Sequence, residues 1–225
     1  MATRTSRSTR RRAPLTRERV LRAAMALADQ GGFDGLTMRR LAKELGVEAM
    51  SLYNHVASKD DLLDGMVDLV FAEIEPPPAG GDWRTAMRER AISTREALGR
   101  HRWAIGLMEG RATHGPANLA LHDAVLGCLR AAGFSLPMTV HALSVQDAYI
   151  YGFALQERDM SPESADDFAA EAQRQMRDYR AVLDGYPNLV EVVGGYVAEV
   201  GYDYASEFVF GLDLILDGLD KLRDA

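Results

Sequence analysis

Residues 36–59, LTMRRLAKELGVEAMSLYNHVASK, constrain the fold more than any other part of this chain, because they predict two short helices joined by a glycine turn. Thr37 stands where the side chain that caps the first helix is expected. Gly46 follows the apolar stripe of that helix, at the position where a residue in the left-handed conformation ends it. A second helix is predicted over residues 49–55, and it buries Leu52. This arrangement is typical of a helix-turn-helix, whose second helix enters the major groove of DNA.

The flanking residues predict one further helix on each side of this motif. The first runs from about Thr16 to Gln30 and ends at two glycines. The other begins at Ser58, continues to Ile74, and is long enough to reach from the helix-turn-helix into the rest of the chain. The segment EPPPAGGD at 75–82 then breaks the helical pattern and is the best boundary-like feature of the sequence.

Helical periodicity resumes after this break. We find no repeat, no alternation of strands and helices, and no convincing strand pattern. The sequence therefore predicts an all-α fold, with a three-helix helix-turn-helix domain followed by a larger helical domain. Further helices are expected near 82–100, 101–108, 116–132, 135–156, 161–183, 188–200 and 202–222.

The formal net charge of −7 conceals a strong asymmetry along the chain. Residues 1–59 contain twelve Lys and Arg against five Asp and Glu, whereas residues 60–225 contain fourteen against twenty-eight. A basic first quarter attracts the phosphate backbone of DNA, and an acidic remainder repels it and so helps to orient the approach. The charge distribution supports a DNA-binding function independently of the helix-turn-helix pattern.

The first thirteen residues, MATRTSRSTRRRA, carry five arginines, no acidic residue and little apolar surface. This composition predicts a basic arm that is disordered when free. Two roles fit such an arm. It can be a solubilising tail, or it can touch phosphates or enter a minor groove beside the recognition helix.

Residues 15–75 resemble the DNA-binding domain of the tetracycline-repressor (TetR) family of bacterial transcriptional regulators. The matching stretches are LTRERVLRAAMALADQGGFDGLTMRRLAKELGV and the run SLYNHVASKDDLL that leads into a long helix. A weaker resemblance, to the ligand-binding domain of the tetracycline-responsive branch, covers residues 83–157. We therefore expect a DNA-binding domain over 14–60 and an effector-binding and dimerisation domain over 61–225. The resemblance implies a homodimeric repressor that a small molecule releases from its double-stranded DNA operator.

The resemblance also implies which residues contact DNA, and their chemistry fits that role. Tyr53 can donate a hydrogen bond to a phosphate oxygen. Arg39 can reach a guanine with its bidentate guanidinium group. Ala49 and Met50 occupy base-reading positions, where they can touch thymine methyl groups but cannot hydrogen-bond through their side chains. The expected DNA contacts are Thr37, Arg39, Ala49, Met50, Ser51, Tyr53, Asn54, His55 and Lys59. A solvated helix face in a domain that binds no DNA is the alternative.

The predicted helix over 202–222 is apolar around most of its circumference. A helix that is apolar on two faces must be buried on two sides. One side can pack on its own domain, and we expect the other to form a subunit interface together with the helix over 135–156. The resemblance implies the same pair of helices in a four-helix dimer bundle. A purely internal core helix is the alternative.

The larger domain is expected to enclose a pocket for an unknown small-molecule effector. The candidate lining residues, each of which could also be ordinary core or surface, are Arg90, Thr94, Met108, His114, Tyr149, Phe153, Met176 and Tyr179. The resemblance aligns Met108 with an imidazole ligand of the magnesium ion that tetracycline carries, and Arg90 with a position where the drug needs a neutral amide. Both differences predict an effector other than tetracycline–magnesium.

The sequence predicts no enzyme, cofactor or metal site. None of the five histidines forms a metal-binding motif, and the chain has no nucleophile elbow and no phosphate-binding glycine loop. The single cysteine, Cys128, is expected in the core and fits a reducing cytoplasm. No stretch is apolar enough to predict a membrane span. The alternative function is an effector-independent DNA-binding or architectural protein whose C-terminal domain only dimerises.

Overall fold

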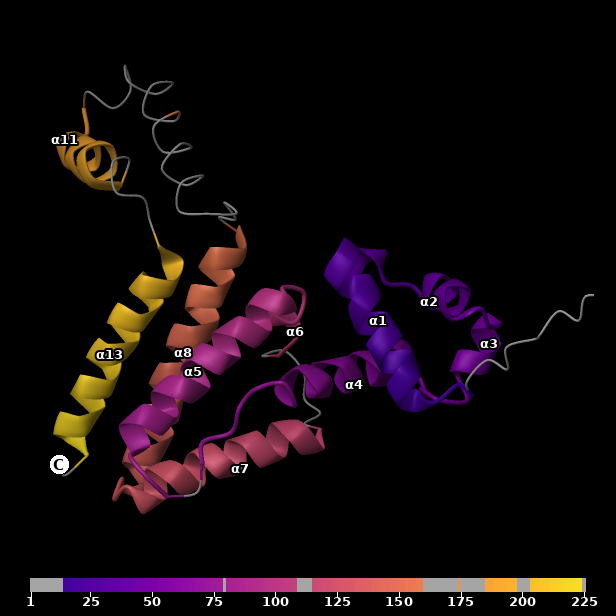
Figure 1. Cartoon of the computed structure of the whole chain (residues 1–225), viewed down its shortest axis with the longest axis horizontal. Coiled ribbons are helices and arrows are strands. Elements are labelled where there is room, and N and C mark those ends of the chain that lie inside the picture. The colour runs from indigo at the N-terminus through magenta and orange to yellow at the C-terminus, as the bar shows by residue number, and fades with distance from the viewer. Residues whose placement is uncertain are drawn as a thin grey trace, which may run out of the picture.

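The computed structural model describes residues 14–78, 80–108, 115–159, 174, 185–197 and 203–223. Every regular element in these ranges is helical, which confirms the all-α prediction (Figure 1). The α-helices are α1 Arg17–Gly31, α2 Met38–Leu45, α3 Ala49–Leu52, α4 Lys59–Phe71, α5 Trp83–Arg100, α6 Ile105–Met108, α7 Pro116–Ala131, α8 Leu136–Asp159, α11 Pro187–Leu189 and α13 Tyr204–Leu222. A 3-10 turn, η1, covers Phe33–Gly35, and a π-helix, η2, covers Val190–Val197.

The helices form two groups that α4 connects. α1, α2 and α3 pack together at one end of the molecule, and we call them the helix-turn-helix unit. α5, α8 and α13 lie side by side at the other end (Figure 1). α4 packs against α1 and also against α7, so the unit is joined to the C-terminal helices, α5 to α13, through α4.

Hydroxyl caps fix the starts of α1, α2 and α4, as the sequence predicts. Thr16 Oγ1 accepts a hydrogen bond of 3.2 Å from the backbone N–H three residues later, and Thr37 Oγ1 accepts one of 3.1 Å in the same way. Ser58 caps α4 through a bond of 3.0 Å. Such a cap contributes about 1 kcal/mol. Gly46 has φ 64° and ψ 43°, a left-handed conformation that a side chain would strain, and it ends α2.

The recognition helix is shorter than predicted. The predicted helix over 49–55 is too long, because α3 ends at Leu52 and residues 53–55 form a turn. The N–H groups of His55 and Val56 both donate to the carbonyl oxygen of Leu52, which turns the chain and directs Val56 into the core. No glycine or proline marks this end in the sequence.

The expected helix over 101–108 is also shortened, to the single turn Ile105–Met108. Its first half leaves the helical path because Trp103 donates to the carboxylate of Asp29 in α1 and the His101 ring contacts the same carboxylate. A contact to a distant part of the chain overrides the local helical pattern here.

Three other predicted segments either lie outside the described residues or form a different kind of helix from the one predicted. The basic arm at 1–13 lies outside them, and so does the expected helix over 161–183 apart from position 174. The segment near 188–200 is described as α11 followed by η2, up to residue 197. The expected helices near 82–100, 116–132, 135–156 and 202–222 correspond to α5, α7, α8 and α13.

Candidate nucleic-acid interface and effector site

Several of the residues expected to contact DNA have exposed side chains. Arg39, Asn54 and Lys59 are exposed. Met50 exposes 75% of its surface, more than any other large apolar residue in the described part of the chain, and Tyr53 exposes 44%. Met50 on α3 and Tyr53 in the turn that follows are therefore accessible to an external surface.

The remaining expected contacts are partly committed to the unit itself. The hydroxyl of Thr37 caps α2. Ala49, Ser51 and His55 are half-buried, and the Ser51 hydroxyl donates to a backbone carbonyl three residues earlier at 2.6 Å. The backbone carbonyl of His55 accepts a bond of 3.1 Å from Arg17 of α1. These hydrogen bonds hold the recognition helix in place, whether or not the same residues also contact DNA.

An ion pair that the sequence did not reveal fixes the turn between α3 and α4. Asp61 Oδ1 accepts a bond of 2.6 Å from Arg17 Nη2, and Asp61 Oδ2 accepts one of 2.7 Å from the backbone N–H of Ala57. The hydrogen bond from Arg17 holds the pKa of the Asp61 carboxyl group below its ordinary value. This pair ties the start of α1 to the start of α4 and so orients the turn that carries Tyr53. The sequence signals only that Ser58 and Asp61 have the three-residue spacing of a capping box.

α4 is attached to the C-terminal helices by a carboxylate that caps another helix. α7 starts at Gly115, which has no side chain to serve as a cap. Asp68, half-buried on α4, takes that role by accepting bonds of 3.0 Å from the N–H groups of both Ala117 and Asn118. A negative charge there also interacts favourably with the positive end of the α7 dipole. α4 therefore docks on α7 in one defined orientation.

A second connection joins the end of α1 to the end of α5. Asp29 Oδ1 accepts a bond of 2.6 Å from Trp103 Nε1 and contacts His101 Nδ1 at 2.8 Å. The other ring nitrogen of His101 lies 3.2 Å from both carboxylate oxygens of Glu73, which also accepts from Arg100. Burial raises the pKa of the Glu73 carboxyl group, but the bonds from Arg100 and His101 outweigh burial and hold that pKa below its ordinary value. These groups form a polar junction between the helix-turn-helix unit and the C-terminal helices.

Arg90 is the most unusual polar residue of the C-terminal helices. It is 3% exposed, and its Nη2 donates to Asp147 Oδ1 of α8 at 2.7 Å. Nε and Nη1 of Arg90 are buried, and the described residues supply no hydrogen-bond partner for either. The buried Oε1 of Gln146, the residue before Asp147, also lacks a partner among them. A buried guanidinium with unused N–H groups is costly unless an acceptor reaches it.

A second polar and aromatic cluster lies between α8 and α13. Tyr149 donates its hydroxyl proton to the Phe208 carbonyl oxygen at 2.9 Å, and the two rings stack with centroids 5.4 Å apart. Phe153 meets the Phe208 ring edge-on at 5.2 Å. The Arg95 guanidinium lies 5.4 Å from the Phe208 centroid and pairs with Glu157 through two bonds. These aromatic groups have protein partners and fix the contact between the two helices.

The described residues thus divide the effector candidates into separate groups. Arg90 and Thr94 lie together, because the Thr94 hydroxyl donates to the Arg90 carbonyl one turn away at 2.8 Å. Tyr149 and Phe153 form part of the cluster at α13. Met108 is buried in α6. The candidates that lie outside the described residues are His114, Met176 and Tyr179.

Cys128 on α7 is half-buried and packs against the core. Burial raises the pKa of the Cys128 thiol, which disfavours the nucleophilic thiolate. The described ranges contain no group of three or more His, Cys, Asp and Glu side chains placed to hold a metal ion. In the same ranges, no helix combines the length and apolar character that crossing a bilayer requires.

Comparisons with known proteins match both parts of the chain. Residues 20–66 match the family described as "Bacterial regulatory proteins, tetR family", and residues 75–223 match "Tetracyclin repressor-like, C-terminal domain". The transcriptional repressor DrrR1 of Streptomyces coeruleorubidus is 35% identical over 92% of this chain and 78% of its own length. The class A tetracycline repressor from transposon 1721 of Escherichia coli is 33% identical over 91% of this chain and 90% of its own length. The crystal structure of ActR of Streptomyces coelicolor in complex with actinorhodin has a TM-score of 0.77 at 29% identity, covering 95% of this chain and all of that one.

Proposed function

The chain belongs to the TetR family of bacterial transcriptional regulators, and from this we infer that it is a homodimeric repressor which a small-molecule effector releases from its DNA operator. The observation that carries the DNA-binding part is the exposure of Met50 on α3 and of Tyr53 in the turn that follows α3. A duplex DNA partner supports a cytoplasmic location.

DNA recognition is assigned to the residues of α2, α3 and the start of α4. Arg39, Tyr53, Asn54 and Lys59 supply donors for base edges and phosphates. Met50 supplies apolar contact with thymine methyl groups. The remaining assigned contacts are Thr37, Ala49, Ser51 and His55. The arm at 1–13 adds positive charge for the phosphate backbone.

Salt dependence of operator binding tests this assignment. With DNA that flanks the gene of this protein, Tyr53→Phe is expected to weaken binding of the dimer about 30-fold, because each half-site loses a hydrogen bond of about 1 kcal/mol. Lys59→Ala is expected to make the slope of log K against log salt shallower by about two for the dimer, since each subunit releases one fewer counterion.

Lys221→Ala is the control for the salt slope, because it removes the same charge at the end of α13, far from the helix-turn-helix unit (Figure 1). At concentrations where sedimentation shows it to be a dimer, it should leave the salt slope unchanged. Equal salt slopes for the wild type and Lys59→Ala, together with wild-type affinity for Tyr53→Phe, would contradict the assigned interface.

Dimerisation is assigned to the outer faces of α8 and α13. Phe210 and Leu214, one turn apart on α13, expose 64% and 58% of their surfaces. Leu136 and Val140 are exposed with the same spacing on α8, which packs against α13. Two adjacent apolar stripes form the kind of exposed patch that marks an interface. A second copy of the chain is the partner, because a two-fold axis brings the same patch against itself.

Leu214→Glu tests this interface, because a symmetric dimer buries the new charge twice. The variant is expected to sediment as a monomer at concentrations where the wild type is a dimer, and to bind the operator at least about 100-fold more weakly because only one half-site is engaged. Leu119→Glu is the control, since Leu119 on α7 is 57% exposed but lies off this face. A monomeric Leu119→Glu beside a dimeric Leu214→Glu would place the interface on α7.

Effector binding is assigned to the neighbourhood of Arg90. Its unused Nε and Nη1 donors support an effector that presents acceptor groups, such as carbonyl or carboxylate oxygens, to α5. The cation at this position also argues against tetracycline–magnesium. Thr94, Met108, Tyr149, Phe153, His114, Met176 and Tyr179 are the further assigned lining residues.

Release from DNA follows if the effector favours an arrangement in which the two helix-turn-helix units no longer match their half-site spacing. α4 is the connecting element, because it carries Lys59 at one end and docks on α7 through Asp68. The effector then lowers DNA affinity by the ratio of its affinities for the two arrangements.

A further inference from the structure

The turn that follows α3 is held by a side chain from the start of α1. We call residues 53–57 the recognition turn, because it carries the expected DNA contact Tyr53. Arg17 Nη1 donates to the carbonyl oxygen of His55 at 3.1 Å, and the same nitrogen donates to Asp61 Oδ2 at 2.9 Å. One guanidinium group therefore joins the recognition turn to the first turn of α4.

Most of the hydrogen-bonding capacity of this guanidinium is used within the protein. Nη2 of Arg17 donates to Asp61 Oδ1 at 2.6 Å and to the backbone carbonyl oxygen of Asp61 at 3.4 Å. Together with the two bonds from Nη1, these bonds account for four of the five N–H groups that an arginine side chain offers. The positive charge is also paired with a carboxylate. Arg17 is therefore placed to act on DNA binding through the turn and not as a contact.

The other side of the recognition turn is held by the same ion pair. Asp61 Oδ2 accepts a bond of 2.7 Å from the backbone N–H of Ala57. Between the two attachments, Val56 is 1% exposed and packs in the core. The turn is thus attached at His55, Val56 and Ala57, and the exposed Tyr53 directly precedes these attachments. Loss of the ion pair frees two of the three attachments, so that Tyr53 is held less closely.

A glycine allows α1 and α4 to meet at this ion pair. A Cβ atom built at Gly65 of α4 would lie 2.7 Å from Leu21 Cδ2 and 3.3 Å from Arg17 Nη2. The first distance is too short for two carbon atoms that share no bond, and Leu21 is 7% exposed and has little room to move aside. Glycine at this position keeps α1 close enough to α4 for Arg17 to reach both His55 and Asp61.

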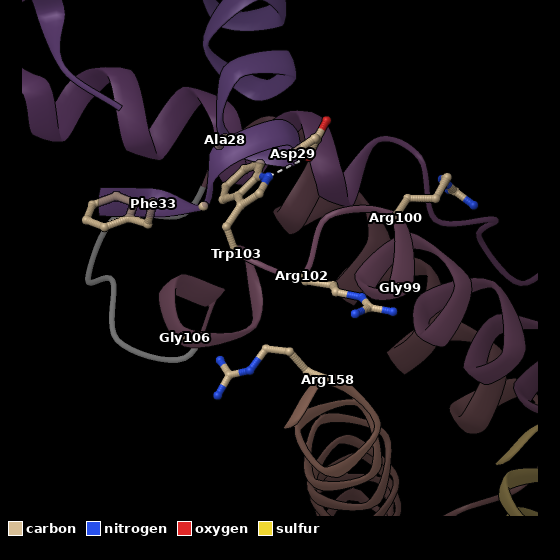
Figure 2. A pocket seen from close by; sticks show the side chains of 10 residues that line it. Ala28, Asp29, Phe33, Gly99, Arg100, Arg102, Trp103, Gly106 and Arg158 are labelled. Atoms are coloured by element: carbon tan, nitrogen blue, oxygen red, sulfur yellow. Dashed lines mark hydrogen bonds between the residues drawn. The ribbon is translucent and has the colours of Figure 1, made fainter. Parts of the chain in front are cut away.

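The far end of α1 is attached to the C-terminal helices. Figure 2 shows the bond from Trp103 Nε1, in the turn between α5 and α6, to Asp29 Oδ1, and this bond is 2.6 Å long. α1 is one continuous helix from Arg17 to Gly31, so it forms a stiff connection between that bond and the guanidinium at its start. The recognition turn is therefore connected to the C-terminal helices through α1 as well as through α4.

We propose that Arg17 is a positioning residue for operator recognition, which sets the conformation of the recognition turn without itself contacting DNA. A turn that is free to move must be ordered when the protein binds DNA, and the loss of conformational entropy weakens binding. The pair of Arg17 and Asp61 orders the turn before DNA arrives. Its effect on operator affinity rests on the proposed function, whereas its effect on the turn in the free protein does not.

Arg17→Lys tests the proposal, because it keeps the positive charge and removes the planar fork that reaches His55 and Asp61 together. We expect the variant dimer to bind the operator about tenfold more weakly than the wild type, with an unchanged salt slope. Asp61→Asn removes the charge from the other half of the pair and should weaken binding by a similar factor. In the double variant the two losses should not add, because both remove the same contact.

Arg22→Lys is the matched control, because Arg22 lies on the same helix and pairs with Glu18 of that helix. It should bind the operator as the wild type does. Hydrogen exchange of the full-length protein without DNA gives a second readout. The amide of Ala57 is expected to exchange faster in Arg17→Lys and Asp61→Asn than in the wild type and Arg22→Lys, while the amides of α5 keep their wild-type rates.

Weaker operator binding at an unchanged salt slope, together with faster exchange at Ala57, supports the positioning role. Wild-type operator affinity in Arg17→Lys would overturn it, and so would a shallower salt slope or an equal loss of affinity in Arg22→Lys. If the wild type itself does not bind the operator, the proposed function fails. Exchange at Ala57 then still decides whether Arg17 holds the recognition turn, so the two failures are distinguishable.

Discussion

Replacing Asp147 by alanine is expected to lower the free energy of unfolding by about 3 kcal/mol, because it removes the carboxylate that the described residues place against the buried guanidinium of Arg90. The bond between Arg90 Nη2 and Asp147 Oδ1 is 2.7 Å long, and Arg90 is 3% exposed. Its other two nitrogens have no partner among the described residues. Removal of Asp147 therefore leaves the whole cation uncompensated. Urea unfolding of the variant and the wild type measures the difference.

The double variant Arg90→Met with Asp147→Leu is the control for this prediction. It removes both charges and replaces them with apolar side chains of similar length, a change that is often close to neutral for a buried pair. We expect it to recover most of the stability lost in Asp147→Ala and to bind the operator as the wild type does. An Asp147→Ala variant as stable as the wild type would mean that Arg90 is solvated or otherwise compensated.

The same double variant separates folding from effector recognition. If Arg90 presents its Nε and Nη1 groups to the effector, the folded double variant will bind DNA but will no longer release it when the effector is added. An unchanged response would remove Arg90 from the effector site while leaving the repressor function intact. The free energy of unfolding and the release from DNA on addition of the effector therefore test Arg90 independently.

Local signals in the sequence predicted the helix-turn-helix unit well. The caps at Thr16, Thr37 and Ser58 and the left-handed Gly46 act within a single turn of helix, so their spacing along the chain is enough to place them. The end of α3 was missed, because it is set by two hydrogen bonds to the carbonyl of Leu52 and carries no glycine or proline.

Contacts between distant segments could not be predicted in this way. Arg17 and Asp61, or Asp29 and Trp103, are far apart in the sequence and meet only when α1 packs on its neighbours. Arg90 was singled out through the family resemblance, but its burial and its unused donors follow from the packing of α5 on α8.

Replacing Asp68 by alanine is expected to lower the free energy of unfolding by about 2 kcal/mol, because α7 loses both its cap and the charge at the positive end of its dipole. The carboxylate accepts two bonds of 3.0 Å from the first turn of α7. Asp68→Asn keeps an oxygen acceptor without the charge and should lose about half as much. Hydrogen exchange at the amides of Ala117 and Asn118 should become faster in the alanine variant.

The effect of Asp68→Ala on DNA binding distinguishes a structural cap from a connection between the two parts of the molecule. Asp82 caps α5, not α7, by accepting from the N–H of Thr85 at 2.8 Å, so Asp82→Ala is the matched control. Only Asp68→Ala releases α4 from its fixed orientation, and ordering the freed unit again on DNA is expected to weaken operator binding about tenfold. If both variants bind the operator equally well, the docking of α4 on α7 does not set the placement of the helix-turn-helix unit, and the polar junction of Asp29, His101 and Trp103 must set it alone.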